Sequence, residues 1–358
     1  MSAVTEIAPS DPRGVPEIEA VIERHGWGSL IRGGLTAFPG RNENWAGTTT
    51  AGVQVFIKKI DGPDAPARFD RALSFTQLAH RAPDVPSPLC IAWDEPSRVL
   101  VFELLPGARS GSHLARSGSF TDVMAGDAGR IVGRLHRITV DEALDTTPPS
   151  WPRLDGLRAL TVSDFVARSG AQLELFGLLQ NDCRLVSAIT VLGEHSRRAP
   201  AAPTHCDLRL DQFLAYNGTL HLADWEELRA EDPARDVGAF LGEWVHRCVR
   251  AIARDGAVTP ETIISSGVRN LERSRPLLRA FWNGYQEAGE VTDPQLASRS
   301  AAYAGWHLLD RVLAASTERA RLHALDRAGI GIARKLLCSP DDFRDALGLP
   351  ASQSGARS

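Results

Sequence analysis

The sequence predicts an α+β fold with two lobes, a small β-rich lobe followed by a large, mainly α-helical lobe. Apolar and polar residues alternate with a period of two in the first third of the chain, whereas apolar residues recur at helical spacing from about residue 120 onward. A Pro-Gly pair at 106–107 ends the last early strand. We therefore expect an N-lobe over residues 1–105, a C-lobe over 106–350 and a flexible tail over 351–358.

In the N-lobe, the segment GVQVFIKKI (52–60) places Val53, Val55 and Ile57 on one side of a half-buried strand. The turn-rich segment 38–52 before it is consistent with a hairpin that leads into this strand. Residues 65–81 have the pattern of an amphipathic helix. Residues 98–107 form an apolar strand that stops at the Pro-Gly pair.

In the C-lobe, apolar residues at helical spacing predict helices over 125–138, 170–196, 276–289 and 302–316. Two short strand-like segments, THCDLRLDQFL (204–214) and TLHLADWEE (219–227), interrupt this helical half. These two segments carry most of the polar residues that we assign to a functional site.

Composition excludes several classes of function. The 358 residues have 43% hydrophobic and 23% charged residues, typical of a globular protein, and the net charge of −4 gives no reason to expect a nucleic-acid partner. No apolar run approaches the roughly 18 residues of a membrane span, and no secretory signal is visible at the N-terminus. The five cysteines are scattered and odd in number, which favours reduced thiols and a cytoplasmic location.

The two strand-like segments together form an oxygen-rich site. Asp207, the amide of Gln212 and Asp224 offer the hard oxygen ligands that Mg²⁺ prefers. Without a metal, Asp207 could orient a hydroxyl and accept its proton, as phosphoryl transfer requires. Two alternatives stay open, a cluster of aspartates that close turns and a metal-dependent hydrolase that uses His205, Asp207 and Asp224.

The order H-x-D-x-x-x-x-N, followed by an apolar strand that ends in Asp, resembles the aminoglycoside phosphotransferase-like kinases, which are relatives of the protein kinases. The corresponding segments here are HCDLRLDQFL and LHLADWEELRAEDPARDVG, with VFIK (55–58), VLVFELLPG (99–107) and GRLHR (133–137) preceding them in the family's order. The resemblance covers residues from about 35 to 345. It implies a bilobal protein-kinase-like fold, ATP and Mg²⁺ as cofactors, and an ATP cleft between the lobes.

The resemblance also implies roles for single residues. Asp207 corresponds to the catalytic base, Asp224 to the main Mg²⁺ ligand, and Lys58 to the lysine that contacts the α- and β-phosphates. Lys59 is the competing choice for that lysine. His205 and Asp236 are expected to be structural residues that hold the catalytic loop.

Other positions complete the nucleotide site that the resemblance implies. A turn with Gly40, Asn42, Asn44 and Gly47 would cover the phosphates with backbone N–H groups. The hinge from Glu103 to Leu105 would offer its main chain to adenine.

The sequence departs from the family pattern at several positions. Gln212 replaces an Asn that binds the second metal, and Cys206 stands where the family commonly has Gly. The helix over 65–81 has no Glu to pair with Lys58, so we expect Asp70, the nearest acid on that helix, to substitute for it. Arg209 could bind the transferring phosphoryl group bidentately or be a solvated or Asp-paired arginine.

The acceptor hydroxyl has two candidates. The segments 40–60 and 205–213 are similar to the kinase subunits of class V lanthipeptide-type synthetases, which phosphorylate Ser and Thr of a ribosomally made precursor peptide before a partner lyase eliminates the phosphate. The alternative is a small-molecule kinase for an antibiotic or a sugar-like hydroxyl. A further hypothesis is a catalytically inactive nucleotide-binding scaffold, because Gln212 and the missing Glu depart from the family pattern.

Overall fold

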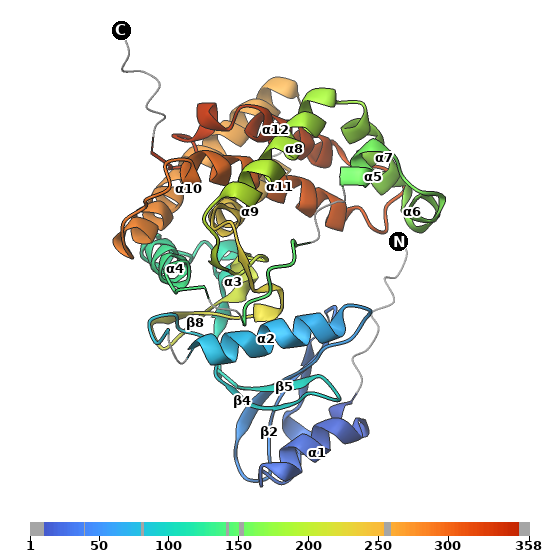
Figure 1. The fold of residues 1–358 in the computed structure, drawn as a ribbon, viewed down its shortest axis with the longest axis vertical. Coiled ribbons are helices and arrows are strands. Elements are labelled where there is room, and N and C mark those ends of the chain that lie inside the picture. The colour runs from blue at the N-terminus through green and yellow to red at the C-terminus, as the bar shows by residue number, and fades with distance from the viewer. Residues whose placement is uncertain are drawn as a thin grey trace. The chain divides into compact units, whose positions relative to one another are not determined.

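The computed structural model describes residues 11–38, 40–79, 82–140, 143–149, 154–253 and 259–350. The backbone forms two compact units (Figure 1). The first unit comprises Met1–Arg109 and Leu214–Leu228, and the second comprises Ser110–Phe213 and Arg229–Ser358. This division differs from the expected boundary after residue 105 mainly because the chain returns to the first unit at residues 214–228.

The first unit contains an antiparallel five-stranded sheet in the order β1-β2-β3-β5-β4. Two helices and a short hairpin accompany this sheet. The elements are α1 (Pro16–Arg24), β1 (Thr36–Phe38), β2 (Glu43–Thr48), β3 (Gln54–Lys59), α2 (Ala65–Ala79), β4 (Cys90–Asp94), β5 (Val99–Glu103), β8 (Phe213–Tyr216) and β9 (Thr219–Leu222). The short strand β6 (Arg109–Ser110) lies where the chain passes from this unit to the second.

The two faces of this sheet have separate cores, one with each helix (Figure 1). Val55 and Ile57 of β3 pack with apolar residues of α1, while Leu100 of β5 packs with Phe69 and Ala72 of α2. Because side chains alternate along a strand, Lys58 points to the opposite face from Val55 and Ile57. The alternation predicted for this strand therefore places the lysine on the side of the sheet that α2 covers.

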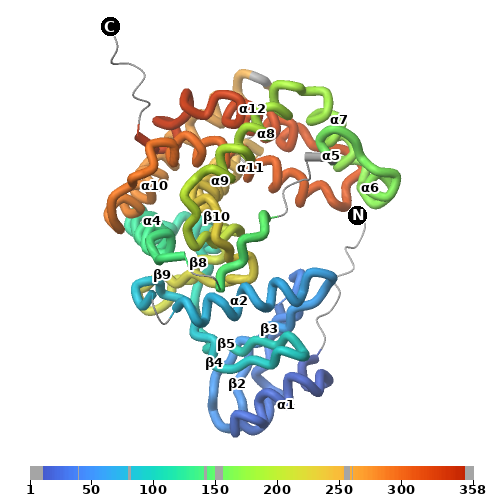
Figure 2. The backbone as a smooth tube through the Cα atoms, in the orientation of Figure 1, coloured from blue at the N-terminus to red at the C-terminus, as the bar shows by residue number. Residues whose placement is uncertain are grey.

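The second unit is mainly α-helical. Its elements are α3 (Gly111–Arg116), α4 (Asp122–Leu135), α5 (Leu154–Arg158), α6 (Val162–Ala167), α7 (Gly170–Gln180), α8 (Cys183–Arg198), β7 (Ala202–Thr204), β10 (Arg229–Glu231), α9 (Ala234–Ala251), α10 (Pro260–Glu287), α11 (Leu296–Ala315) and α12 (Ala324–Cys338). Helix α4 packs on α10, and α11 packs on α9 and α12 (Figure 2).

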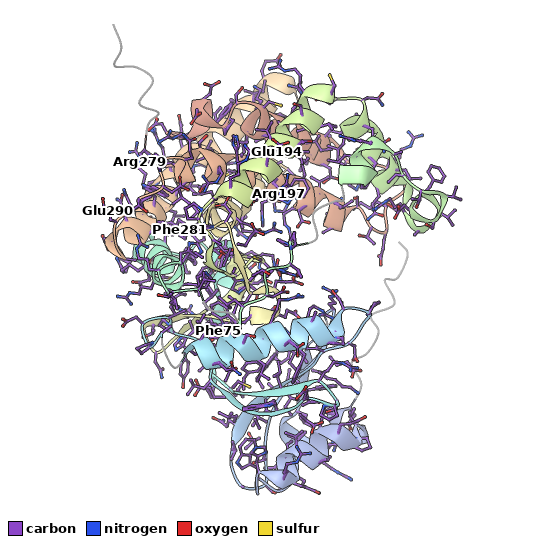
Figure 3. The ribbon with its side chains drawn as sticks, viewed as in Figure 1. Phe75, Glu194, Arg197, Arg279, Phe281 and Glu290 are labelled. Atoms are coloured by element: carbon purple, nitrogen blue, oxygen red, sulfur yellow. The ribbon has the colours of Figure 1, made fainter. Side chains whose placement is uncertain are left out.

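Close packing within the helical unit depends on small residues and stacked rings. A Cβ atom added at Gly129 of α4 would lie 2.0 Å from the carbonyl oxygen of Phe281 on α10, so only glycine permits this approach. The ring of Phe281, labelled in Figure 3, stacks on Phe240 of α9 with centroids 3.9 Å apart. Helices α4, α9 and α10 thus share one core.

The α+β fold class is confirmed, with a β-sheet region followed by a helical region. The single helix expected over 170–196 is wrong, because the chain ends α7 at Gln180 and starts α8 at Cys183. Asp182 causes this break by capping α8, its carboxylate accepting a hydrogen bond from the backbone N–H of Leu185 at 3.1 Å. The expected flexible tail at 351–358 and the end of the helix expected over 65–81 lie outside the described residues.

In the described part of the chain, no single helix has the length and apolar character to cross a membrane. The pair α7 and α8 meets that test by length and composition when taken together, but the two helices are bent by 88° at their junction.

Candidate functional site

Lys58 lies in a buried ion-pair network in the first unit. Its Nζ donates hydrogen bonds to Oδ1 of Asp224 and, at 3.1 Å, to Oε1 of Glu226. The Lys58 side chain is 11% exposed. Burial by itself lowers the pKa of Lys58, but the carboxylates of Asp224 and Glu226 outweigh it and raise the pKa above the ordinary value. The lysine is therefore held as a cation.

Asp224 follows β9 in a left-handed backbone conformation, with φ of 73°. Aspartate tolerates this conformation better than most residues. The next residue, Trp225, stacks on Phe75 of α2 with ring centroids 3.5 Å apart, and its Nε1 donates to Oγ of Ser87 at 2.9 Å (Figure 3 labels Phe75). Trp225 thus attaches the polar residues on either side of it to α2.

The acidic partner of Lys58 comes from this segment rather than from α2. Asp70, the expected substitute, is exposed on α2, and Lys58 pairs with Asp224 and Glu226 instead. The assignment of Asp70 is therefore corrected, because the buried face of α2 carries Arg68 and Arg71 rather than an acid. Sequence reasoning missed Glu226, although it stands two residues after Asp224 in the quoted ADWEE segment.

The predicted phosphate-covering turn contributes one side chain to this network. Asn42 is 6% exposed, and its Nδ2 donates to Oε1 and Oε2 of Glu226 at 3.1 and 2.9 Å. Asn44 lies on β2 and donates from Nδ2 to the carbonyl oxygen of Asn42 at 3.0 Å. Gly40 lies in the turn before β2, and Gly47 lies inside β2.

The predicted hinge begins at the end of β5. The N–H of Glu103 donates to the carbonyl oxygen of Leu89, and the N–H of Leu104 donates to that of Gln54. The carbonyl oxygen of Leu105 accepts from Ala108 and closes a turn. The N–H groups of Glu103 and Leu104 are thus already bonded within the first unit, which leaves the adenine contact a prediction.

In the second unit, Asp236 holds the loop that carries Asp207. Its Oδ2 accepts from the N–H of His205 at 2.7 Å and from Nε2 of His136 at 3.1 Å, while its Oδ1 accepts from the N–H of Cys206 at 2.9 Å. Burial alone would raise the pKa of Asp236, but the bond from His136 and the nearby His205 lower it overall. An ionised carboxylate therefore anchors the loop backbone.

Cys206 shows why this loop position suits glycine. Its φ is 65°, in the left-handed region that side chains other than Gly, Asn and Asp rarely adopt. Burial raises the pKa of its thiol. A protonated thiol is a poor nucleophile, so Cys206, which is partly buried, is assigned to the turn and not to the chemistry.

Arg209 is paired with two carboxylates in this structure. Its Nη1 donates to both oxygens of Asp207 at 3.2 and 2.9 Å, and its Nε and Nη2 donate to Asp211 at 3.1 and 3.0 Å. The Asp207 side chain is 34% exposed, so it remains accessible to solvent. Gln212 ends the short 3-10 helix Leu210–Gln212 and is 6% exposed.

No group of three or more His, Cys, Asp or Glu side chains in the described ranges could hold a metal by itself. In proteins, Mg²⁺ commonly takes one or two carboxylates and completes its shell with phosphate oxygens and water. The carboxylate of Asp224, with a side chain 25% exposed, is chemically suited to that role.

A β-sheet unit with a buried lysine–carboxylate pair and a helical unit with an anchored Asp loop define a phosphotransferase of the kinase-like class. The sequence matches the phosphotransferase enzyme family over residues 34–277, so the chain belongs to that family. The kinase-like fold of this family implies that the protein uses ATP. No curated protein matches the sequence.

Solved structures support the same fold. A choline/ethanolamine kinase family protein from Mesorhizobium loti is 19% identical, with a TM-score of 0.55, over 94% of this chain and 98% of that chain. Amicoumacin kinase hAmiN, in complex with AMP-PNP, Ca²⁺ and Ami, is 12% identical, with a TM-score of 0.57, over 96% and 97%. The streptomycin-ATP ternary complex of APH(2")-IIa is 11% identical, with a TM-score of 0.51, over 92% and 99%. At these identities the likeness establishes the fold alone.

Proposed function

We propose that this protein transfers the γ-phosphoryl group of ATP to a hydroxyl by direct in-line displacement. The observation that carries the proposal is the pairing of Lys58 with Asp224, which lie 166 residues apart in the sequence. A buried cation beside a carboxylate is suited to a nucleotide phosphate with its Mg²⁺ ion. Asp224 would hold this ion, whose charge would offset that of the phosphates.

Each remaining residue has a defined task in this proposal. Lys58 contacts the phosphates as a compact charge, and Asp224 with Gln212 provides the protein oxygens for Mg²⁺. Asp207 orients the acceptor hydroxyl and receives its proton. Arg209 exchanges one of its carboxylate partners for the transferring phosphoryl group and neutralises part of its charge. Positioning and charge stabilisation supply most of the rate acceleration.

We propose Ser and Thr of a ribosomally made precursor peptide as the acceptor, with a separate lyase as partner, in a pathway of the lanthipeptide type. The resemblance of 40–60 and 205–213 to class V kinase subunits supports this acceptor. The second candidate is a small-molecule hydroxyl, which the structural similarity to a choline/ethanolamine kinase family protein and to an amicoumacin kinase favours. The five cysteines are free in the structure, which supports a reducing cytoplasm as the site of action.

The test is incubation of the protein with Mg-ATP and either a Ser/Thr-rich peptide encoded beside its gene or a set of choline, aminoglycoside and sugar hydroxyls. Intact-mass analysis should show the addition of one phosphate to one class of acceptor. Asp207→Asn should reduce transfer about 10²-fold or more while Mg-ATP binding persists. Binding of Mg-ATP with no transfer to any acceptor would favour the inactive scaffold, and metal-dependent ester hydrolysis without ATP binding would favour the hydrolase.

A further inference from the structure

Helix α2 presents buried cations, not an acid, toward the lysine strand. Arg68 is fully buried, and Arg71 is 5% exposed. In protein kinases the corresponding lysine is paired with a Glu from the helix of the small lobe. In this chain the charge on the helix has the opposite sign, so Lys58 needs an anion from another element.

Glu226 supplies that anion and joins the lysine to α2. Its Oε1 accepts from Nζ of Lys58 at 3.1 Å, and its Oε2 accepts from Nη1 of Arg68 at 2.9 Å. Asn42 donates to both oxygens of Glu226 and accepts from Nη1 of Arg68 at 2.8 Å. One carboxylate therefore connects β3, α2 and the turn before β2.

The remaining donors of Arg68 fix its position. Its Nε donates to Oδ1 of Asp64 at 3.2 Å, and its Nη2 donates to the carbonyl oxygen of Asp61. With these two nitrogens fixed, the planar guanidinium of Arg68 can hold Glu226 through Nη1 at a defined distance from α2. The backbone of Glu226 is also held, because Nε of Arg71 donates to its carbonyl oxygen at 2.7 Å.

The charge balance distinguishes the two carboxylates at Lys58. Asp224 is the expected metal ligand, so metal binding would divert its charge from the lysine. Glu226 contacts Arg68 and Asn42 as well as Lys58. These contacts would keep it beside Lys58 whether or not a metal is bound to Asp224. Loss of Glu226 would leave Lys58 and the buried Arg68 without their shared counter-charge, which is costly in a buried site.

We propose that Glu226 is the positioning residue for Lys58 and that Arg68 acts on the lysine through Glu226. Helix α2 then controls the nucleotide lysine through an arginine–glutamate relay instead of a direct glutamate contact. This inference rests on the proposed function, because it assigns Lys58 to the nucleotide phosphates.

The first test is calorimetric titration of the full-length protein with Mg-ATP. Glu226→Gln, which keeps the shape and removes the charge, should weaken binding about tenfold, equivalent to about 1.4 kcal/mol. The matched control Asp70→Asn removes an acid from the exposed side of α2 and should bind as wild type. Arg68→Gln should weaken binding in the wild type but add little in the Glu226→Gln background, because the two residues act in series. Additive effects would show that Arg68 does not act through Glu226.

The second test needs no nucleotide. The rate of Lys58 acylation by an amine-reactive reagent is followed by peptide mass spectrometry as a function of pH. Asp224 and Glu226 both favour the protonated amine, so Glu226→Gln should shift the midpoint for Lys58 to lower pH, with the profile of Lys59 unchanged. An unshifted Lys58 profile would overturn the inference. Failure of the wild-type protein to bind Mg-ATP would instead count against the proposed function, with the acylation test still decisive for Glu226.

Discussion

Asp236→Asn should destabilise the second unit strongly. Asp236 is fully buried, and its two oxygens accept three hydrogen bonds, two from backbone N–H groups and one from His136. An asparagine side chain offers only one oxygen, so at least one of these donors faces an amide NH₂ group. Each bond to a charged group contributes about 1.5–3 kcal/mol, and removal of one partner of a buried pair costs about 3–5 kcal/mol. We expect a loss of about 3–5 kcal/mol in the free energy of unfolding.

Urea unfolding of the wild type and the variant at neutral pH measures this difference. The matched control is Asp345→Asn, which alters an exposed carboxylate paired with Arg275 and Arg279 and should leave the midpoint unchanged. The folded pKa of Asp236 lies below its ordinary value of 3.8. Its contribution is therefore complete above that pH and is lost as the pH falls through the folded pKa, so the two proteins should converge in acid. A difference below about 1 kcal/mol at neutral pH would refute the reasoning.

Two further predictions concern the helical unit. Burial lowers the pKa of His246 from 6.5 to about 4, so as the pH falls the unfolded chain binds this proton before the folded protein does. The wild type should therefore lose about 3 kcal/mol of unfolding free energy between pH 6.5 and pH 4. In urea unfolding, His246→Gln should lack this part of the pH dependence, and equal pH dependences for the two proteins would contradict the assignment. Gly129→Ala should cost about 1–3 kcal/mol or more because its Cβ would clash with the backbone of α10. Gly177→Ala on α7 has open space and should be neutral or stabilising by up to about 1 kcal/mol, and equal thermal shifts for the two glycine variants would show that α4 and α10 are not in close contact.

The strand of Lys58 shows what local pattern can predict. Alternation over 52–60 identified both the strand and the side of the sheet to which the lysine points, because that geometry repeats every two residues. Of the two candidate lysines, Lys58 is the one whose side chain pairs with Asp224, and its contact with the nucleotide phosphates stays a prediction.

The partner of that lysine shows the limit of local pattern. Proximity in sequence and the pattern of related kinases pointed to Asp70, since the helix after the strand usually supplies the acid. The contact is made by Glu226, 168 residues away from Lys58. The break between α7 and α8 was missed for a related reason, because Asp182 acts through a cap that apolar periodicity does not register.

By itself the sequence determined the fold class and the family, and it predicted Lys58, Asp207 and Asp224 as site residues, because strand periodicity and the order of short motifs are local properties of the chain. Only the tertiary structure decided which charges meet. A buried ion pair is selected by the low polarity of its surroundings and by the packing that brings distant segments together. The stacking of Trp225 on Phe75 brings Glu226 to α2, and no pattern within either segment specifies that contact.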